Sequence, residues 1–124
     1  MNFSSKITPE ENTSIARDFE EILKRIKNIE FNLNLPEIQQ KFENEKDESR
    51  KRDFLEQRKN IAILRSQLET AALEEIAANL KKLEPDLLKG IEDLTQAIDK
   101  VDNTVNILTT LQNVTGIIRR VLSL

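Results

Sequence analysis

Residues 9–33, PEENTSIARDFEEILKRIKNIEFNL, carry the pattern that decides the fold. Their apolar side chains recur at alternating intervals of four and three residues. These side chains are Ile15, Phe19, Ile22, Ile26, Ile29 and Leu33. This is the heptad spacing that keeps one side of a helix against a neighbouring helix. The start of the helix is predicted by Thr8 as N-cap, with Glu11 as its capping-box partner. Its end is predicted by Pro36, because the residue before a proline is pushed away from helical backbone.

A second heptad pattern follows Pro85, a residue that is well tolerated in the first turn of a helix. It consists of Leu87, Ile91, Leu94, Ile98, Val101, Val105 and Leu108. Acidic residues are concentrated at its beginning, where the helix dipole favours negative charge. The pattern predicts a last helix over about residues 85–122.

The middle of the chain, residues 36–84, has no Gly and no Pro after its first residue and is rich in helix-forming residues. Its apolar pattern is interrupted, however, because residues 43–53 contain no apolar side chain. Either a helix runs through this polar stretch, continuous or kinked near residues 45–53, or the chain turns near residues 45–49 and Asp53 with Glu56 caps a new helix. We favour the continuous helix, since no turn residue interrupts it.

The composition supports an all-α fold. Only two Gly and three Pro occur among 124 residues, too few for the turns of a sheet protein. Two heptad patterns on a short chain predict an elongated antiparallel bundle of three or four long amphipathic helices with coiled-coil-like heptad packing. Residues 1–124 are expected to form a single helical domain.

No motif for catalysis is visible. The chain has no His and no Cys, which removes the usual bases, nucleophiles and soft-metal ligands. Gly90 and Gly116 stand alone, whereas a phosphate-binding loop needs clustered glycines. We therefore predict that the protein is not an enzyme, with no catalytic residue, no metal ligand and no cofactor.

Net charge and targeting signals restrict the partners and the location that the sequence predicts. The net charge of −3 at pH 7 gives no reason to expect nucleic acid as a partner. The first residues do not resemble a signal peptide, no stretch approaches the roughly 20 apolar residues of a membrane span, and Cys is absent, so we expect a cytoplasmic location. The basic run Arg50–Arg52 is interpreted as a solvated helix surface rather than a site for phosphate or lipid headgroups, because acidic residues surround it.

The C-terminal segment, residues 107–124, departs from the heptad pattern. Its apolar side chains move to nearly the opposite side of the helix around Thr109 and Thr110, which predicts a bend there or a tail that packs elsewhere. The tail either completes the protein's own core, the interpretation we favour, or docks on a partner, or lies at a membrane surface. The candidate partner-binding residues are Leu111, Val114, Ile117, Ile118, Val121 and Leu122.

These observations together favour a non-enzymatic helical module for protein–protein interaction or assembly, a scaffold or adaptor. Its expected partners are further copies of itself, giving a homo-oligomer, or another helical protein. The alternative is a membrane-engaging helical bundle that uses the apolar segment 107–124.

Overall fold

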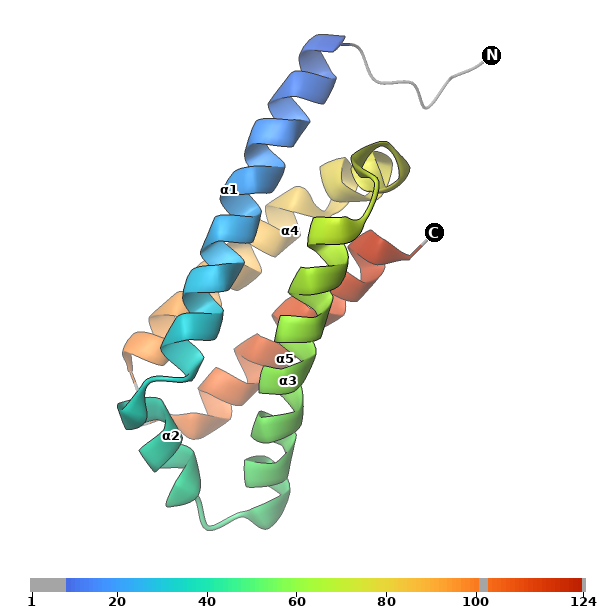
Figure 1. Cartoon of the computed structure of the whole chain (residues 1–124). Helices are drawn as coiled ribbons and strands as arrows, with labels where there is room; N and C mark the ends of the chain where they lie inside the picture. The colour runs from blue at the N-terminus through green and yellow to red at the C-terminus, as the bar shows by residue number, and fades with distance from the viewer. Residues whose placement is uncertain (1–8, 101–102, 124) are drawn as a thin grey trace.

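The structure is a computed structural model that describes residues 9–100 and 103–123. The described part of the chain is entirely helical, so the all-α prediction is confirmed (Figure 1). It contains five helices rather than three or four: α1 (Pro9–Leu33), α2 (Pro36–Glu43), α3 (Glu48–Thr70), α4 (Leu73–Asp99) and α5 (Thr104–Leu122). The extra helices arise from a turn in the polar stretch, which was the less favoured alternative, and from breaks that the sequence pattern did not reveal.

The first helix, α1, spans the same residues as the first predicted helix. All six side chains of its heptad pattern are buried, with exposed fractions between 0 and 9%. Pro36 is the first residue of α2, and Leu35 before it has the extended backbone that a following proline imposes. The proposed cap residue Thr8 lies outside the described residues.

The favoured continuous helix over residues 36–84 is wrong, because the chain turns between α2 and α3. Asp47, not Asp53, is the N-cap of α3: its carboxylate accepts hydrogen bonds from the amides of Ser49 at 2.9 Å and Arg50 at 3.2 Å. A short acidic side chain that bonds to nearby amides competes with helix propagation and starts a new helix instead. The polar stretch therefore contains a turn.

A second break separates α3 from α4 at Ala71 and Ala72, both of which have extended backbone. Neither residue is a turn former, and Ala72 provides no side-chain cap for α4. Burial explains the break: Leu68 before it and Ile76 after it are each 1% exposed in the same core. The free energy of burying apolar side chains on both sides overrides the local helix propensity.

The boundary predicted at Pro85 is also wrong, because Pro85 lies inside α4. A proline there removes one backbone hydrogen bond and costs roughly 3 kcal/mol. Leu83 and Leu87, on either side of it, are 6% and 0% exposed, and their burial offsets that cost.

The predicted last helix is not continuous: α4 ends at Asp99 and α5 begins at Thr104, earlier than the bend expected near Thr109. Asn103 is the N-cap of α5, and its side chain accepts a hydrogen bond of 2.9 Å from the Asn106 amide. The new helix has a different orientation, so Val105 is 50% exposed although the heptad pattern predicted its burial. Val101, another member of that pattern, lies outside the described residues.

The helices form two layers around one apolar core. In Figure 1, α1 and α3 run in opposite directions in the front layer, and α2 joins them at one end. Helices α4 and α5 lie behind and form the most extensive contact in the molecule. Helix α5 also packs against α3, and α1 packs against both α4 and α3. All five helices contribute buried side chains to the core.

Polar contacts join the two helices of the front layer to each other and the front layer to α5. The guanidinium of Arg65 on α3 donates to both carboxylate oxygens of Glu30 on α1, at 2.7 and 3.1 Å. The fully buried hydroxyl of Thr115 on α5 donates a hydrogen bond of 2.8 Å to the side-chain oxygen of Gln57 on α3. Paired guanidinium–carboxylate bonds and satisfied buried hydroxyls favour one packing arrangement over alternatives.

Candidate functional site

The apolar stripe of the C-terminal segment lies inside the molecule. Five of the six residues predicted to bind a partner are buried, with exposed fractions between 0 and 5%, and Leu122 is half-buried. The five buried residues are Leu111, Val114, Ile117, Ile118 and Val121. They contribute to the protein's own core, where α5 packs against α3 and α4. Partner binding by these residues stays a prediction, and it would require α5 to leave the core.

The basic run Arg50–Arg52 does not form a single cationic surface. The Arg50 guanidinium pairs with the Glu45 carboxylate at 2.9 Å, and Arg52 donates a long hydrogen bond of 3.4 Å to the Ser49 hydroxyl. Lys51 lies 3.8 Å from a carboxylate oxygen of Glu48 and also lines a pocket. The acidic neighbours thus engage Arg50 most closely and leave the other two cations only weakly paired.

That pocket lies at the corner between α2 and α3 and has a volume of about 280 Å³. Seven residues line it: Gln39, Phe42 and Glu43 from α2, and Lys51, Phe54, Leu55 and Arg58 from α3. Their spacing explains why they meet, because residues three, four and seven apart share one side of a helix. We call this site the α2–α3 pocket.

Two phenylalanines form its floor. The rings of Phe42 and Phe54 are parallel to within 5°, with centroids 3.7 Å apart, and the two side chains are 2% and 1% exposed. This separation is closer than the offset arrangements that aromatic pairs prefer. Burial of their apolar surface, rather than ring electrostatics, therefore holds the short helix α2 onto α3.

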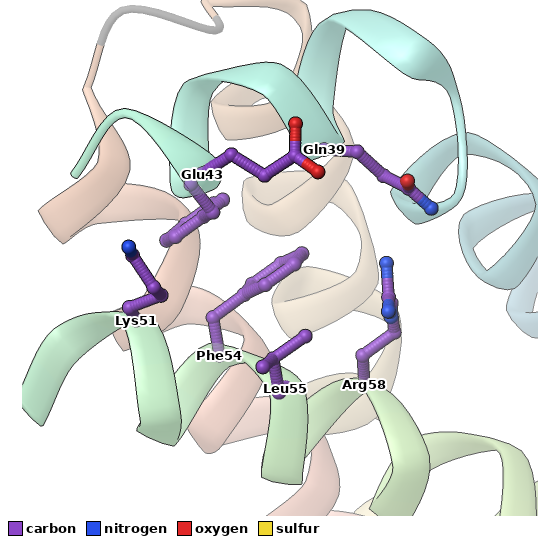
Figure 2. Close-up of a pocket in the computed structure, with 7 residues that line it drawn as sticks. Gln39, Glu43, Lys51, Phe54, Leu55 and Arg58 are labelled. Atoms are coloured by element: carbon purple, nitrogen blue, oxygen red, sulfur yellow. The ribbon is translucent and has the colours of Figure 1, made fainter. Parts of the chain in front are cut away.

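The rim of the α2–α3 pocket is polar, with two cations from α3 and one carboxylate and one amide from α2. Figure 2 shows Lys51 and Arg58 rising from α3 toward α2 on either side of Phe54, while Gln39 and Glu43 come from α2. The guanidinium carbon of Arg58 lies 5.4 Å from the centroid of the Phe54 ring, within the range of a cation–π interaction. Among the described residues, no carboxylate forms an ion pair with Arg58.

Leu55 completes the pocket from α3. Its side chain is 50% exposed, whereas Phe54 beside it in the chain is buried. An apolar side chain at the edge of a buried aromatic pair, with polar groups around it, resembles the anchor regions of protein interfaces. The volume is below the range of about 300–1,000 Å³ that holds a small-molecule ligand, so one or two side chains of a partner fit it better.

Sequence reasoning did not find the α2–α3 pocket. Phe42 and Phe54 flank the polar stretch 43–53, and the favoured prediction ran one helix through both of them, so α2 and α3 were not expected to face each other. The sequence contains one signal for this pocket, which is Leu55. This apolar residue follows Phe54 directly and therefore lies off the side of the helix that faces the core.

Other kinds of site are not found in the part of the chain that the structure describes. No three His, Cys, Asp or Glu side chains there gather closely enough to hold a metal ion. None of the described helices combines the length and the apolar character needed to cross a lipid bilayer. Comparison of the chain with protein-family models, curated proteins and solved structures finds no match.

Proposed function

We propose that the protein is a non-enzymatic interaction module, a scaffold or adaptor that binds a helix of another chain at the α2–α3 pocket. The observation that carries this proposal is Leu55, which is 50% exposed beside two phenylalanines that are nearly inaccessible. A partner side chain placed on Leu55 would extend this apolar cluster and remove it from water.

The form of the site favours a helical ligand. The pocket residues of α3 follow one another along the helix at intervals of three and four residues, so an anchor and polar contacts are available over two turns. An amphipathic helix presents its own side chains at the same spacing, and helices bind apolar grooves in this way with coiled-coil-like packing. A short extended peptide would match fewer of these positions.

A specific observation also separates this proposal from the membrane alternative. The alternative needs the side chains of residues 107–124, yet those of Leu111, Val114 and Ile118 are fully buried within the protein. Leu55 is accessible without any rearrangement. The homo-oligomer and the cytoplasmic location stay predictions, and sedimentation equilibrium of the purified chain tests the first of them.

The proposal is tested with a photo-crosslinking amino acid in place of Leu55. The matched control carries the same amino acid in place of Lys82, an exposed residue of α4. We expect position 55 to give one reproducible adduct that position 82 does not give, with the cross-linked segment in a helix. The partner is then purified and its binding to the unmodified chain is measured. Equal cross-linking at both positions, or an adduct to a non-helical segment, contradicts the proposal.

A further inference from the structure

The helix positions around Leu55 are all basic. The residues three and four positions before it are Arg52 and Lys51, and those three and four positions after it are Arg58 and Lys59. On an α-helix these four positions are the ones adjacent to a given side chain on the helix surface. A half-exposed leucine is therefore framed by four cations, a set that we call the Leu55 frame.

Few carboxylates contact these four cations. Lys51 lies 3.8 Å from Glu48, while Arg52, Arg58 and Lys59 have no ion pair among the described residues. Asp53 and Glu56 are exposed acids of the same helix, and Glu56 is a helix-surface neighbour of Arg52 and Lys59, but neither acid forms an ion pair with them. The four positions adjacent to Leu55 thus present cations that are mostly not held by ion pairs, on a chain whose net charge is −3.

We infer that the partner helix is acidic and amphipathic, with one large apolar side chain that contacts Leu55 and carboxylates one turn before and one turn after it. This inference rests on the proposed function and specifies the partner's chemistry. Lys51 and Arg58 are seven residues apart, which corresponds to roughly 10.5 Å along the helix axis. Glu or Asp side chains placed two turns apart on a partner helix match that separation.

The acidic rim residue on α2 makes the recognition directional. Glu43 comes from α2, on the opposite side of the pocket from the Leu55 frame (Figure 2). A carboxylate there disfavours an acidic residue on that side of the partner and favours a lysine, an arginine or an amide. The partner helix is therefore acidic on the side that faces α3 and not on the side that faces α2.

The described part of a second copy of this chain does not supply the complementary surface. Apart from Leu55, the large apolar side chains that are exposed among the described residues are Phe31, Ile63 and Val105. None of the three has an acidic residue one turn away on both sides: Lys27 precedes Phe31, Lys59 precedes Ile63, and Thr109 follows Val105. The Leu55 frame therefore fits a different protein better than itself.

Nucleic acid and lipid fit the site less well. The rings of Phe42 and Phe54 are at most 2% exposed and offer no surface on which a base could stack. Glu43 at the rim repels phosphate, and a single half-exposed leucine gives little apolar area for insertion between lipids. The apolar anchor together with a mixed rim favours a protein segment.

A display library of amphipathic helices tests the inference on the full chain. The apolar stripe of the library is constant, and each position beside it is varied among Glu, Gln and Lys. After selection on the immobilised protein, we expect Glu to exceed Lys about tenfold at positions one turn before and one turn after the anchor. Synthetic peptides from the selection should bind more weakly as salt is raised to about 0.5 M.

The matched variants separate charge recognition from folding. Arg52→Glu with Lys59→Glu should reverse the preference, so that Lys is selected where the original protein selects Glu. Neither residue belongs to the core, and both are exposed, so the melting temperature should not change. Lys24→Glu with Lys82→Glu, two exposed lysines of α1 and α4, is the control and should retain the preference for Glu.

Each contrary result has a distinct meaning. Selected helices without a charge preference overturn this inference and leave the helix-binding function standing, whereas a library that yields no binder sensitive to Leu55→Asp contradicts both. Sedimentation with phosphatidylserine vesicles, lost in the Arg52→Glu and Lys59→Glu variant, would identify lipid as the ligand. Self-association that the same variant abolishes would identify a second copy. Either of the last two results overturns the inference.

Discussion

The Thr104 hydroxyl donates a hydrogen bond of 2.6 Å to the Glu45 carboxylate, which ties the turn between α2 and α3 to the first turn of α5. The same carboxylate accepts a hydrogen bond of 3.1 Å from the Asp47 amide and pairs with Arg50 at 2.9 Å. These partners, Thr104 first, lower the pKa of Glu45 from 4.5 to about 2. One side chain thus links the segment that carries the α2–α3 pocket to the rest of the fold.

We predict that Glu45→Gln lowers the melting temperature at pH 7. Because the folded-state pKa is depressed, the charged carboxylate stabilises the fold above pH 4.5, and this contribution is lost as the pH falls toward about 2. The difference between variant and original protein should therefore shrink over that interval in thermal melts. Glu56→Gln, an exposed position of α3, is the control, and an equal loss there would refute the role given to Glu45.

Glu84 should behave in the opposite way. Burial and then the neighbouring Asp18 carboxyl raise the pKa of Glu84, so its charged form is disfavoured in the folded state. The fold gains stability when this group is protonated and loses it as the pH rises from 4.5 through the folded-state pKa. We predict that Glu84→Gln raises the melting temperature at pH 7 and makes no difference well below pH 4.5. A lower melting temperature at pH 7 would contradict this prediction.

The sequence identified the elements that buried periodicity determines and missed those that depend on distant contacts. Helix α1 has a regular stripe and a proline after it, so local rules suffice. Asp47 is a residue type that favours helix N-caps, which indicates a helix start. Because no Gly or Pro lies nearby, the helix propensity of its neighbours outweighed this indication and favoured a continuous helix. The break at Ala71 and Ala72 has no local signal, because it follows from burial on both sides.

The candidate site depends on those same breaks. Phe42 and Phe54 lie on either side of the polar stretch in the sequence, and they meet only because the chain reverses at residues 44–47. A pocket between two helices that were read as one helix was not accessible to pattern analysis. The basic residues around Leu55 are visible in the sequence, but the exposure of Leu55 follows from the fold.

Helices α4 and α5 approach closely at Gly90. A Cβ atom there would lie 3.2 Å from the Asn113 side-chain nitrogen and 3.3 Å from a methyl group of Val114. We predict that Gly90→Val forces the helices apart and destabilises the protein by about 1–3 kcal/mol in urea unfolding.

Gly116 provides the matched control for this prediction. A Cβ atom at Gly116 meets no other atom within 4 Å, so Gly116→Ala gains helix propensity without a clash. It should stabilise the protein by about 0.8–1 kcal/mol. If both substitutions change stability in the same direction, the close approach at Gly90 is not what determines the effect.

A charge in the centre of the core should unfold the protein. Ile22 is 1% exposed, and an aspartate in its place has no cation available among the buried side chains. We predict that Ile22→Asp costs roughly 4 kcal/mol or more, a large part of the stability of a small domain. Lys24→Asp on the exposed side of α1 should be tolerated in the same circular dichroism melts. Lys27 is another exposed lysine of α1, but it would not be a neutral control, because its side chain pairs with the Glu69 carboxylate at 3.1 Å.

Deletion of residues 110–124 decides whether α5 belongs to the core or serves as a docking element. The deletion removes five apolar side chains whose exposed fractions are at most 5%, and each contributes roughly 1.5–3 kcal/mol through burial. It also removes the backbone carbonyls of Val121 and Ser123 that accept hydrogen bonds from Asn79 at 3.2 and 2.6 Å. Together the five side chains contribute about 7.5–15 kcal/mol, which is comparable to the roughly 5–15 kcal/mol that is typical for the unfolding of a whole domain. Even half of this loss would unfold a marginally stable fold. We therefore expect the truncated chain to lose its cooperative melt and to bind a dye that detects exposed apolar surface. A truncated chain that melts cooperatively and is more soluble would show that α5 is dispensable for folding, and would restore the docking role predicted for its apolar stripe.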